Sequence, residues 1–177
     1  MFIDANLRFC TDKDFGGNVS TIHNVEQLAS DEIDLGSVGD FDIGLGHPLY
    51  LHILPTLDPS PFNGEQTGSA AYIDSIAWTL YHRNRPWGLS GNLSVLLQET
   101  ANSAYPLKIG ETVIYRLNPT LGHEDGRYLR FSVRIKGTAA TGGASDAVQC
   151  RLSAWISGEG PLTDTASRPQ VTGWGVS

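Results

Sequence analysis

The sequence predicts an all-β protein built from antiparallel strands, and three observations support this prediction. Apolar residues recur with a period of two along several short segments, as expected for strands that bury one face. Loops rich in Gly, Pro, Asn and Asp separate these segments, and such residues favour turns. The loops leave no room for the crossover helices that parallel strands need. An antiparallel sandwich or barrel follows.

The clearest predicted strand is RYLRFSVRIK, residues 127–136, in which apolar and polar positions alternate strictly. One face carries Leu129, Phe131, Val133 and Ile135. Further strands are predicted over residues 32–36, 48–54, 73–81, 92–99, 111–117 and 147–156. Only residues 22–29, IHNVEQLA, carry apolar residues at intervals of three, which suggests one or two turns of helix.

The chain length of 177 residues fits one domain with extended ends. Neither end shows a sustained hydrophobic period. We therefore expect an N-terminal arm over residues 1–20, a β domain over residues 21–157 and a C-terminal arm over residues 158–177. Because a disordered tail rarely contains tryptophan, Trp174 suggests that the C-terminal arm orders against a neighbour.

Composition argues against several classes of partner. A net charge of −7 disfavours binding to nucleic acid or to an anionic membrane surface. The two cysteines, Cys10 and Cys150, are too few for a disulfide framework and are expected to be reduced thiols. The first residues do not resemble a secretory signal, and no apolar run is long enough to span a membrane. We expect a cytosol-like compartment.

No pattern of residues indicates a catalytic, cofactor or metal site. Asp34, Asp40 and Asp42 lack the spacing and the closing glutamate of a calcium loop. The GLGHP segment precedes a strand instead of opening a helix, so it is not a dinucleotide fingerprint. The five histidines are scattered, and His52 is expected on the outer face of a strand. We therefore expect neither an enzyme nor a bound cofactor.

A candidate partner surface consists of basic and aromatic side chains on the outward faces of two predicted strands and in nearby segments. Basic side chains in an acidic chain suit an acidic partner, and aromatic residues are enriched at interfaces. The alternative is that the basic residues pair with acidic residues of adjacent strands. The candidate residues are Arg130, Arg134, Lys136, Tyr128, Trp155, Trp87 and Trp174.

Short motifs along the chain resemble those of a known protein family. In order, they are FIDANLRF, IDLGSVGDFDIGLGHPLYLHI, LSVLLQET, RYLRFSVRIKG and CRLSAWI. This order resembles the jelly-roll capsid cement (decoration) proteins of short-tailed bacteriophages, of the Bordetella-phage type. The resemblance spans roughly residues 1–156, and the chain departs from it by inserts at 54–72 and 81–92 and by the tail after residue 158.

The resemblance implies an antiparallel jelly-roll sandwich with extended arms and a structural, non-enzymatic role. Proteins of this family lie on the outer surface of the icosahedral head in the virion, after assembly in the host cytoplasm. They clamp neighbouring copies of the major capsid protein, usually as homodimers near two-fold axes, although a trimer is also open. No cofactor, nucleic acid or membrane is implied as a partner.

Two other functions remain open from the sequence. A carbohydrate-binding module or virion adhesin on the same sandwich would use Trp87, Trp155 and Tyr128 as a platform for sugar rings. A cupin-type enzyme would place histidines from several strands around a metal.

Overall fold

The computed structural model describes residues 7–35, 49–65, 68–86, 93–117, 127–141 and 145–158. Within these residues the chain forms ten strands and one short helix. Their bounds are β1 (Arg8–Asp14), β2 (Gly17–Asn18), α1 (Val19–Ile22), β3 (Glu26–Asp34), β4 (Tyr50–Pro55), β5 (Tyr72–Arg83), β6 (Ser94–Ala101), β7 (Val113–Arg116), β8 (Tyr128–Thr138), β9 (Ala147–Val148) and β10 (Arg151–Ser157). The prediction of an all-β, antiparallel protein is confirmed.

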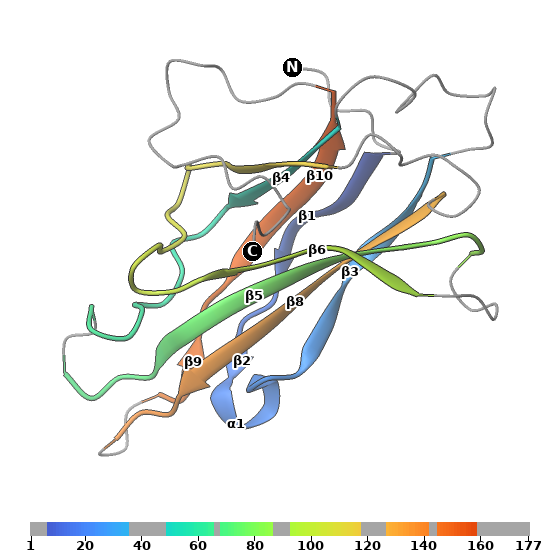
Figure 1. Cartoon of the computed structure of the whole chain (residues 1–177). Coiled ribbons are helices and arrows are strands. Elements are labelled where there is room, and N and C mark those ends of the chain that lie inside the picture. Colours follow the sequence, from blue (N-terminus) through green and yellow to red (C-terminus); the bar gives the residue numbers. More distant parts are fainter. Residues whose placement is uncertain are drawn as a thin grey trace, which may run out of the picture.

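Two four-stranded sheets lie face to face in a sandwich-like arrangement (Figure 1). The first, here called the β10 sheet, has the strand order β1-β10-β4-β7. The second, here called the β8 sheet, has the order β3-β8-β5-β6. A short pair, β2 with β9, lies beside them. All the pairings between these strands are antiparallel.

Five of the pairings are nested along the described part of the chain. The outermost joins β1 to β10, the next joins the short strands β2 and β9, and the third joins β3 to β8. Inside these, β4 pairs with β7 and β5 pairs with β6. Strands that are consecutive in the sequence therefore usually belong to different sheets, so most of the stabilising contacts join distant parts of the chain.

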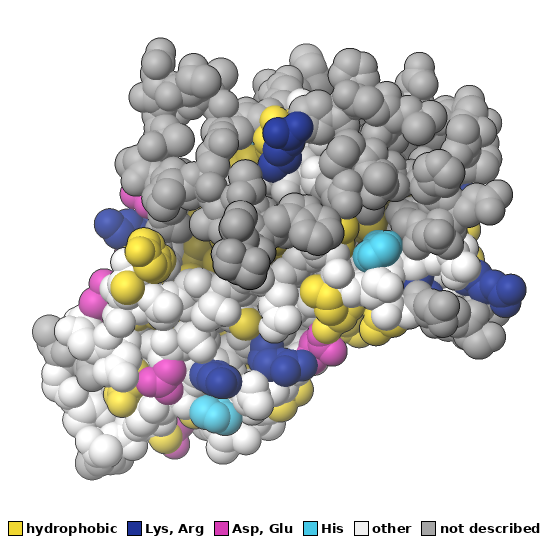
Figure 2. All heavy atoms as spheres, viewed as in Figure 1, with side chains coloured by type: hydrophobic (Ala, Val, Ile, Leu, Met, Phe, Trp, Pro, Cys, Tyr) yellow, Lys and Arg dark blue, Asp and Glu magenta, His cyan; other side chains and the backbone are white. Residues whose placement is uncertain are grey.

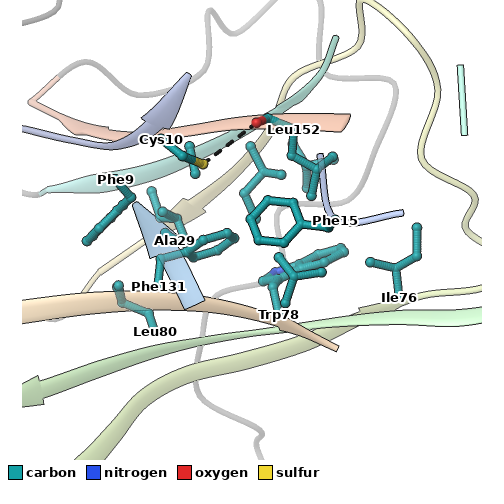
Figure 3. Packing of buried hydrophobic residues seen from close by; sticks show 14 of the residues in the cluster. Phe9, Cys10, Phe15, Ala29, Ile76, Trp78, Leu80, Phe131 and Leu152 are labelled. Carbon is teal, nitrogen blue, oxygen red and sulfur yellow. Dashed lines mark hydrogen bonds between the residues drawn. The ribbon is translucent and has the colours of Figure 1, made fainter. Parts of the chain in front are cut away.

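Apolar side chains from both sheets fill the space between them (Figure 3). Phe9 of β1 stacks on Phe131 of β8, with ring centroids 5.8 Å apart. At another point Trp78 of β5 meets Tyr115 of β7 at 5.9 Å. Such contacts are worth about 0.5–1.5 kcal/mol beyond the burial of the rings. The core-facing residues predicted from the alternation are all fully buried, namely Leu129, Phe131, Val133 and Ile135.

The predicted strand over residues 147–156 is interrupted in the structure, which forms β9 and β10 instead. The backbone of Gln149 turns to the neighbouring loop, where it exchanges hydrogen bonds with Ser60 at 2.8 and 3.0 Å. At the same break the carbonyl of Cys150 accepts a hydrogen bond from the backbone of Phe15. A Cβ on Gly16 would lie 2.4 Å from the carbonyl oxygen of Val148, so only glycine permits this close approach.

The prediction of an N-terminal arm over residues 1–20 is wrong for residues 7–20, which the structure describes. Arg8–Asp14 form β1, which pairs with β10 at one edge of the β10 sheet. Phe9, Cys10 and Phe15 are buried in the core. The sequence signal was weak because the pairing of β1 with β10 shifts register twice, which breaks the period of two. Residues 1–6 and most of the C-terminal arm expected over residues 158–177 lie outside the described residues.

The helical turn expected over residues 22–29 is also wrong. The helix α1 ends at Ile22, the first residue of this segment. The Asn18 side chain caps the start of the helix by accepting a hydrogen bond from the backbone N–H of Ser20. From Glu26 onward the chain is β3, paired with β8. Leu28 lies opposite Ser132 on the outward face, so its spacing from Ile22 does not mark a buried helical stripe. Pairing with a neighbouring strand overrides a local helical preference.

We expect Phe9→Ala to lower the free energy of unfolding by about 3–5 kcal/mol, because it removes a ring packed between the two sheets. Urea denaturation monitored by tryptophan fluorescence measures the change. Thr11→Ala, at an exposed position of the same strand, is the control and should change stability by less than about 0.5 kcal/mol. Equal, small effects of both substitutions would mean that β1 is an arm after all.

Candidate functional site

The residues predicted to form a partner surface lie on opposite sides of the sandwich. Arg130, Arg134, Lys136 and Tyr128 all project from the outer face of the β8 sheet, since they alternate with the buried residues of β8. Trp155 projects from the outer face of the β10 sheet. The structure therefore brings the first four together and separates them from Trp155. Trp87 and Trp174 lie outside the described residues.

The basic residues of β8 face an acidic strand. Glu26 and Glu32 of β3 lie directly opposite Arg134 and Arg130 in the register of the two strands. Opposite charges at facing positions of an antiparallel pair are mutually stabilising. Basic and acidic side chains lie side by side on the exposed surface of this sheet (Figure 2). This charge pattern fits the alternative that the basic residues pair with acidic neighbours.

Glu26 is the centre of a polar network on this face. Its carboxylate accepts hydrogen bonds from the Tyr81 hydroxyl at 2.5 Å and from the Ser132 hydroxyl at 2.8 Å. Partial burial is the largest single effect and raises the pKa of Glu26, whereas these two hydrogen bonds lower it. The charges of Arg134 and Arg130 act in the same direction, and the pKa of Glu26 is lowered. Three strands, β3, β8 and β5, are thereby joined through one carboxylate.

Tyr81 is the other half of this hydrogen bond. Partial burial raises the pKa of its hydroxyl, and so does the hydrogen bond it donates to Glu26. A protonated hydroxyl held against an ionised carboxylate is a strong, charge-assisted contact. The pair links β5 to β3 across the outer face.

Tyr128 offers only part of its ring to a partner. The guanidinium of Arg127 lies over this ring, 5.0 Å from its centroid. Arg127 is in turn held by Asp34 of β3 through two hydrogen bonds of 2.6 and 2.7 Å. Bidentate pairs of this kind are geometrically specific. Arg134 and Lys136, further along β8, are exposed, and Lys136 lies opposite the small Ser75 of β5.

The outer face of the β10 sheet carries an aromatic pair. The rings of His52 and Trp155, at facing positions of β4 and β10, stack with centroids 5.1 Å apart and an interplanar angle of 8°. His52 Nε2 lies 2.8 Å from the hydroxyl oxygen of Ser157. Although both rings point outward from the sheet, His52 is 3% and Trp155 is 7% exposed. Trp155 therefore presents no open ring surface to a partner.

The sugar-stacking platform considered from the sequence also depends on where the aromatic residues lie. Trp155 and Tyr128 are on opposite outer faces, so a single sugar chain does not stack on both. The third residue of that platform, Trp87, is outside the described residues.

The described residues contain no group of three or more His, Cys, Asp or Glu side chains placed to hold a metal ion. Cys10 and Cys150 are free and buried. Burial raises the pKa of Cys10 to about 11 and that of Cys150 to about 12. Because the thiolate is the nucleophile, thiols with such pKa values are inert at neutral pH. Cys10 instead donates a weak hydrogen bond to the carbonyl of Leu152 at 3.6 Å (Figure 3).

Comparison of the sequence with protein-family models found no matching family, and a search of curated proteins found no match. Among the described residues, no helix has the length and apolar character needed to cross a membrane.

We expect Tyr81→Phe to raise the pKa of Glu26, because the substitution removes a hydrogen bond that stabilises the carboxylate. The carboxyl carbon shift of Glu26, followed by NMR through an acid titration, gives the pKa directly. Since the pKa of folded Glu26 lies below its unfolded value, its stabilising contribution is present above the unfolded pKa. That contribution is lost as the pH falls through the folded pKa.

Tyr105→Phe is the matched control, because Tyr105 is an exposed tyrosine in the loop between β6 and β7. It should leave the pKa of Glu26 unchanged. An identical Glu26 pKa in the wild type and in Tyr81→Phe would show that the hydroxyl contact does not stabilise the anion.

Proposed function

We propose that this chain is a capsid cement protein. It binds the outside of a bacteriophage head in the virion and clamps neighbouring subunits of the major capsid protein, after synthesis in the host cytoplasm. The order of the sequence motifs supports this proposal, and one structural observation carries it furthest. That observation is the nested pairing of the strands, which supports the jelly-roll fold that the family resemblance implies.

A jelly roll is a long antiparallel hairpin wrapped into two sheets of four strands, and it contains two Greek keys. Wrapping in this way pairs the first long strand with the last, the second with the next to last, and so inward. The pairs β1 with β10, β3 with β8, β4 with β7 and β5 with β6 follow this scheme. The split into the orders β1-β10-β4-β7 and β3-β8-β5-β6 follows it too. This arrangement supports a jelly roll, a fold used in viral capsids.

A rigid β-sandwich suits the mechanical role of clamping capsid subunits together. Packaged DNA presses the shell outward, so the shell ruptures where contacts between capsid subunits fail. A rigid domain that touches two subunits adds contact area that must also be broken. As a homodimer, one cement unit engages two shell sites, and the second site binds at a high effective concentration.

The outer face of the β8 sheet supports a role as the shell contact. It is the face that carries the exposed cations Arg134 and Lys136 in a chain of net charge −7. Complementary charge chiefly sets the rate and orientation of association. Glu26 and Glu32 on the same face give the surface a mixed pattern, which suits a partner with charges of both signs.

Cosedimentation with phage heads assembled without this protein tests the proposal. Binding should saturate at a fixed number of copies per major capsid subunit, and the loaded heads should resist heating that ruptures bare heads. An unrelated acidic protein of similar size is the control. If the folded chain fails to bind such heads at any concentration tested, the proposed function is wrong.

We expect Arg134→Gln with Lys136→Gln to weaken binding to the heads by about tenfold at low salt, or ~1.4 kcal/mol. Neutral replacements are preferable to charge reversal, because Glu26 lies opposite Arg134 and would repel a new acidic group there. The loss should shrink as salt is raised, since screening weakens exposed charge pairs. The amount bound per head, measured against free concentration, gives the affinity.

The control is Lys13→Gln with Arg151→Gln, which removes the same charge from β1 and β10 on the other sheet. It should leave the affinity within about twofold of the wild type, a difference of only ~0.4 kcal/mol. Equal weakening by both pairs would indicate an effect of net charge, and it would reject the outer face of the β8 sheet as the contact.

A further inference from the structure

The edge strand β6 carries one charged side chain, and that side chain lies on the inner face of the β8 sheet. Glu99 is directly opposite Trp78 of β5 in the register of the two strands. Facing residues of an antiparallel pair project to the same side of the sheet, with Cβ atoms about 4.5–5.5 Å apart. Trp78 is 2% exposed and packs in the core between the sheets (Figure 3). Glu99 is therefore a carboxyl group at the margin of the apolar core.

The surroundings of Glu99 are apolar on the described elements that pack there. Along β6, the same face carries Leu97 and Ala101, which are both buried. The inward neighbours of Trp78 on β5 are apolar and buried as well. From the opposite sheet, the titratable side chain at this point is Tyr115 of β7, whose ring centroid lies 5.9 Å from that of Trp78. Burial raises the pKa of Glu99, and among the described residues no charged neighbour or hydrogen bond opposes this effect.

The indole N–H of Trp78 is the second unusual group at this place. Its Nε1 is buried and, within the described part of the chain, has no hydrogen-bond partner. A buried donor without an acceptor is unfavourable. The pairing of β5 with β6 brings a potential acceptor, the carboxyl group of Glu99, to the facing position.

The charge on Glu99 decides whether a contact between the two groups is favourable. Moving a carboxylate into apolar surroundings costs more free energy than one hydrogen bond returns. A neutral carboxylic acid does not carry this cost, and its oxygen still accepts a hydrogen bond from an N–H group. Protonation therefore favours the inward position of this side chain, and ionisation favours the position toward solvent.

We propose that Glu99 is a proton-controlled latch on the edge strand β6. The neutral acid turns toward Trp78, accepts a hydrogen bond from the indole N–H and fastens β6 to β5. The ionised form turns to solvent and leaves β6 more weakly held. Among the described strands, β5 is the only neighbour of β6, so the latch acts on the single attachment of this strand. It is a property of the isolated chain and does not depend on the proposed cement function.

The direction of the pH dependence follows from burial. Since the pKa of Glu99 in the folded chain lies above its ordinary value, the stabilising contribution of the latch is fully present below the ordinary pKa. It is lost as the pH rises through the raised pKa of the folded chain. Glu26 has the opposite dependence on β3, the other edge strand of this sheet, because its pKa is lowered. Mild acid therefore fastens β6, whereas the contacts of Glu26 that hold β3 are lost only in stronger acid.

The indole N–H resonance of Trp78 gives the first test by NMR. In the full-length wild type, this resonance should titrate with the same midpoint as the carboxyl carbon of Glu99, and Glu99→Gln should abolish the titration. Trp78→Phe identifies the resonance by its disappearance. Glu65→Gln, at an exposed glutamate outside β6, is the matched control and should leave the midpoint unchanged. A Trp78 resonance that does not follow the titration of Glu99 overturns the inference.

Hydrogen–deuterium exchange tests whether the latch holds the strand. At neutral pH, the amides of β6 should exchange at least about threefold more slowly in Glu99→Gln than in the wild type, because glutamine keeps the acceptor without the charge. In mild acid the two proteins should exchange these amides at equal rates. The amides of β3 should not differ between them at either pH. Equal rates for β6 at neutral pH would show that the ionisation of Glu99 does not loosen the strand, and the inference would be wrong.

Discussion

The pairing of β1 with β10 is the constraint on which the rest of the structure depends. It joins residues that are distant in the chain, for example Cys10 and Leu152, which are 142 positions apart. Closing so long a loop is entropically unfavourable, and the burial of Phe9, Cys10 and Phe15 between the sheets offsets it. The ion pair of Arg151 with Asp12 outside the core spans 3.1 Å, but exposed pairs of this kind contribute little.

The pairings of the inner strands nest within that of β1 with β10, and the two sheets have different outer faces. The β8 sheet is tied together by charge-assisted hydrogen bonds centred on Glu26, which bridge β3, β8 and β5. The β10 sheet carries the stacked rings of His52 and Trp155. The first face stays polar and exposed, while the aromatic pair of the second is buried. This difference makes the β8 sheet the better surface for a charged partner.

Much of the fold was predictable because the signal lies in short stretches of sequence. The alternation in β8 correctly placed Leu129, Phe131, Val133 and Ile135 in the core. The strand β1 was not predicted, because its two register shifts interrupt the period. The network around Glu26 was also missed. Its members come from three strands, and no local pattern shows that Glu26, Tyr81 and Ser132 meet.

By itself the sequence determined the class of the protein, since alternation and turn residues act within a few positions of one another. It also determined which side of β8 faces solvent. Only the tertiary structure decided which strands are neighbours, because pairing depends on packing between residues far apart in the chain. Tertiary packing also set Arg134 opposite Glu26, buried Trp155 at an outward position and placed β6 at an edge of the β8 sheet among the described strands.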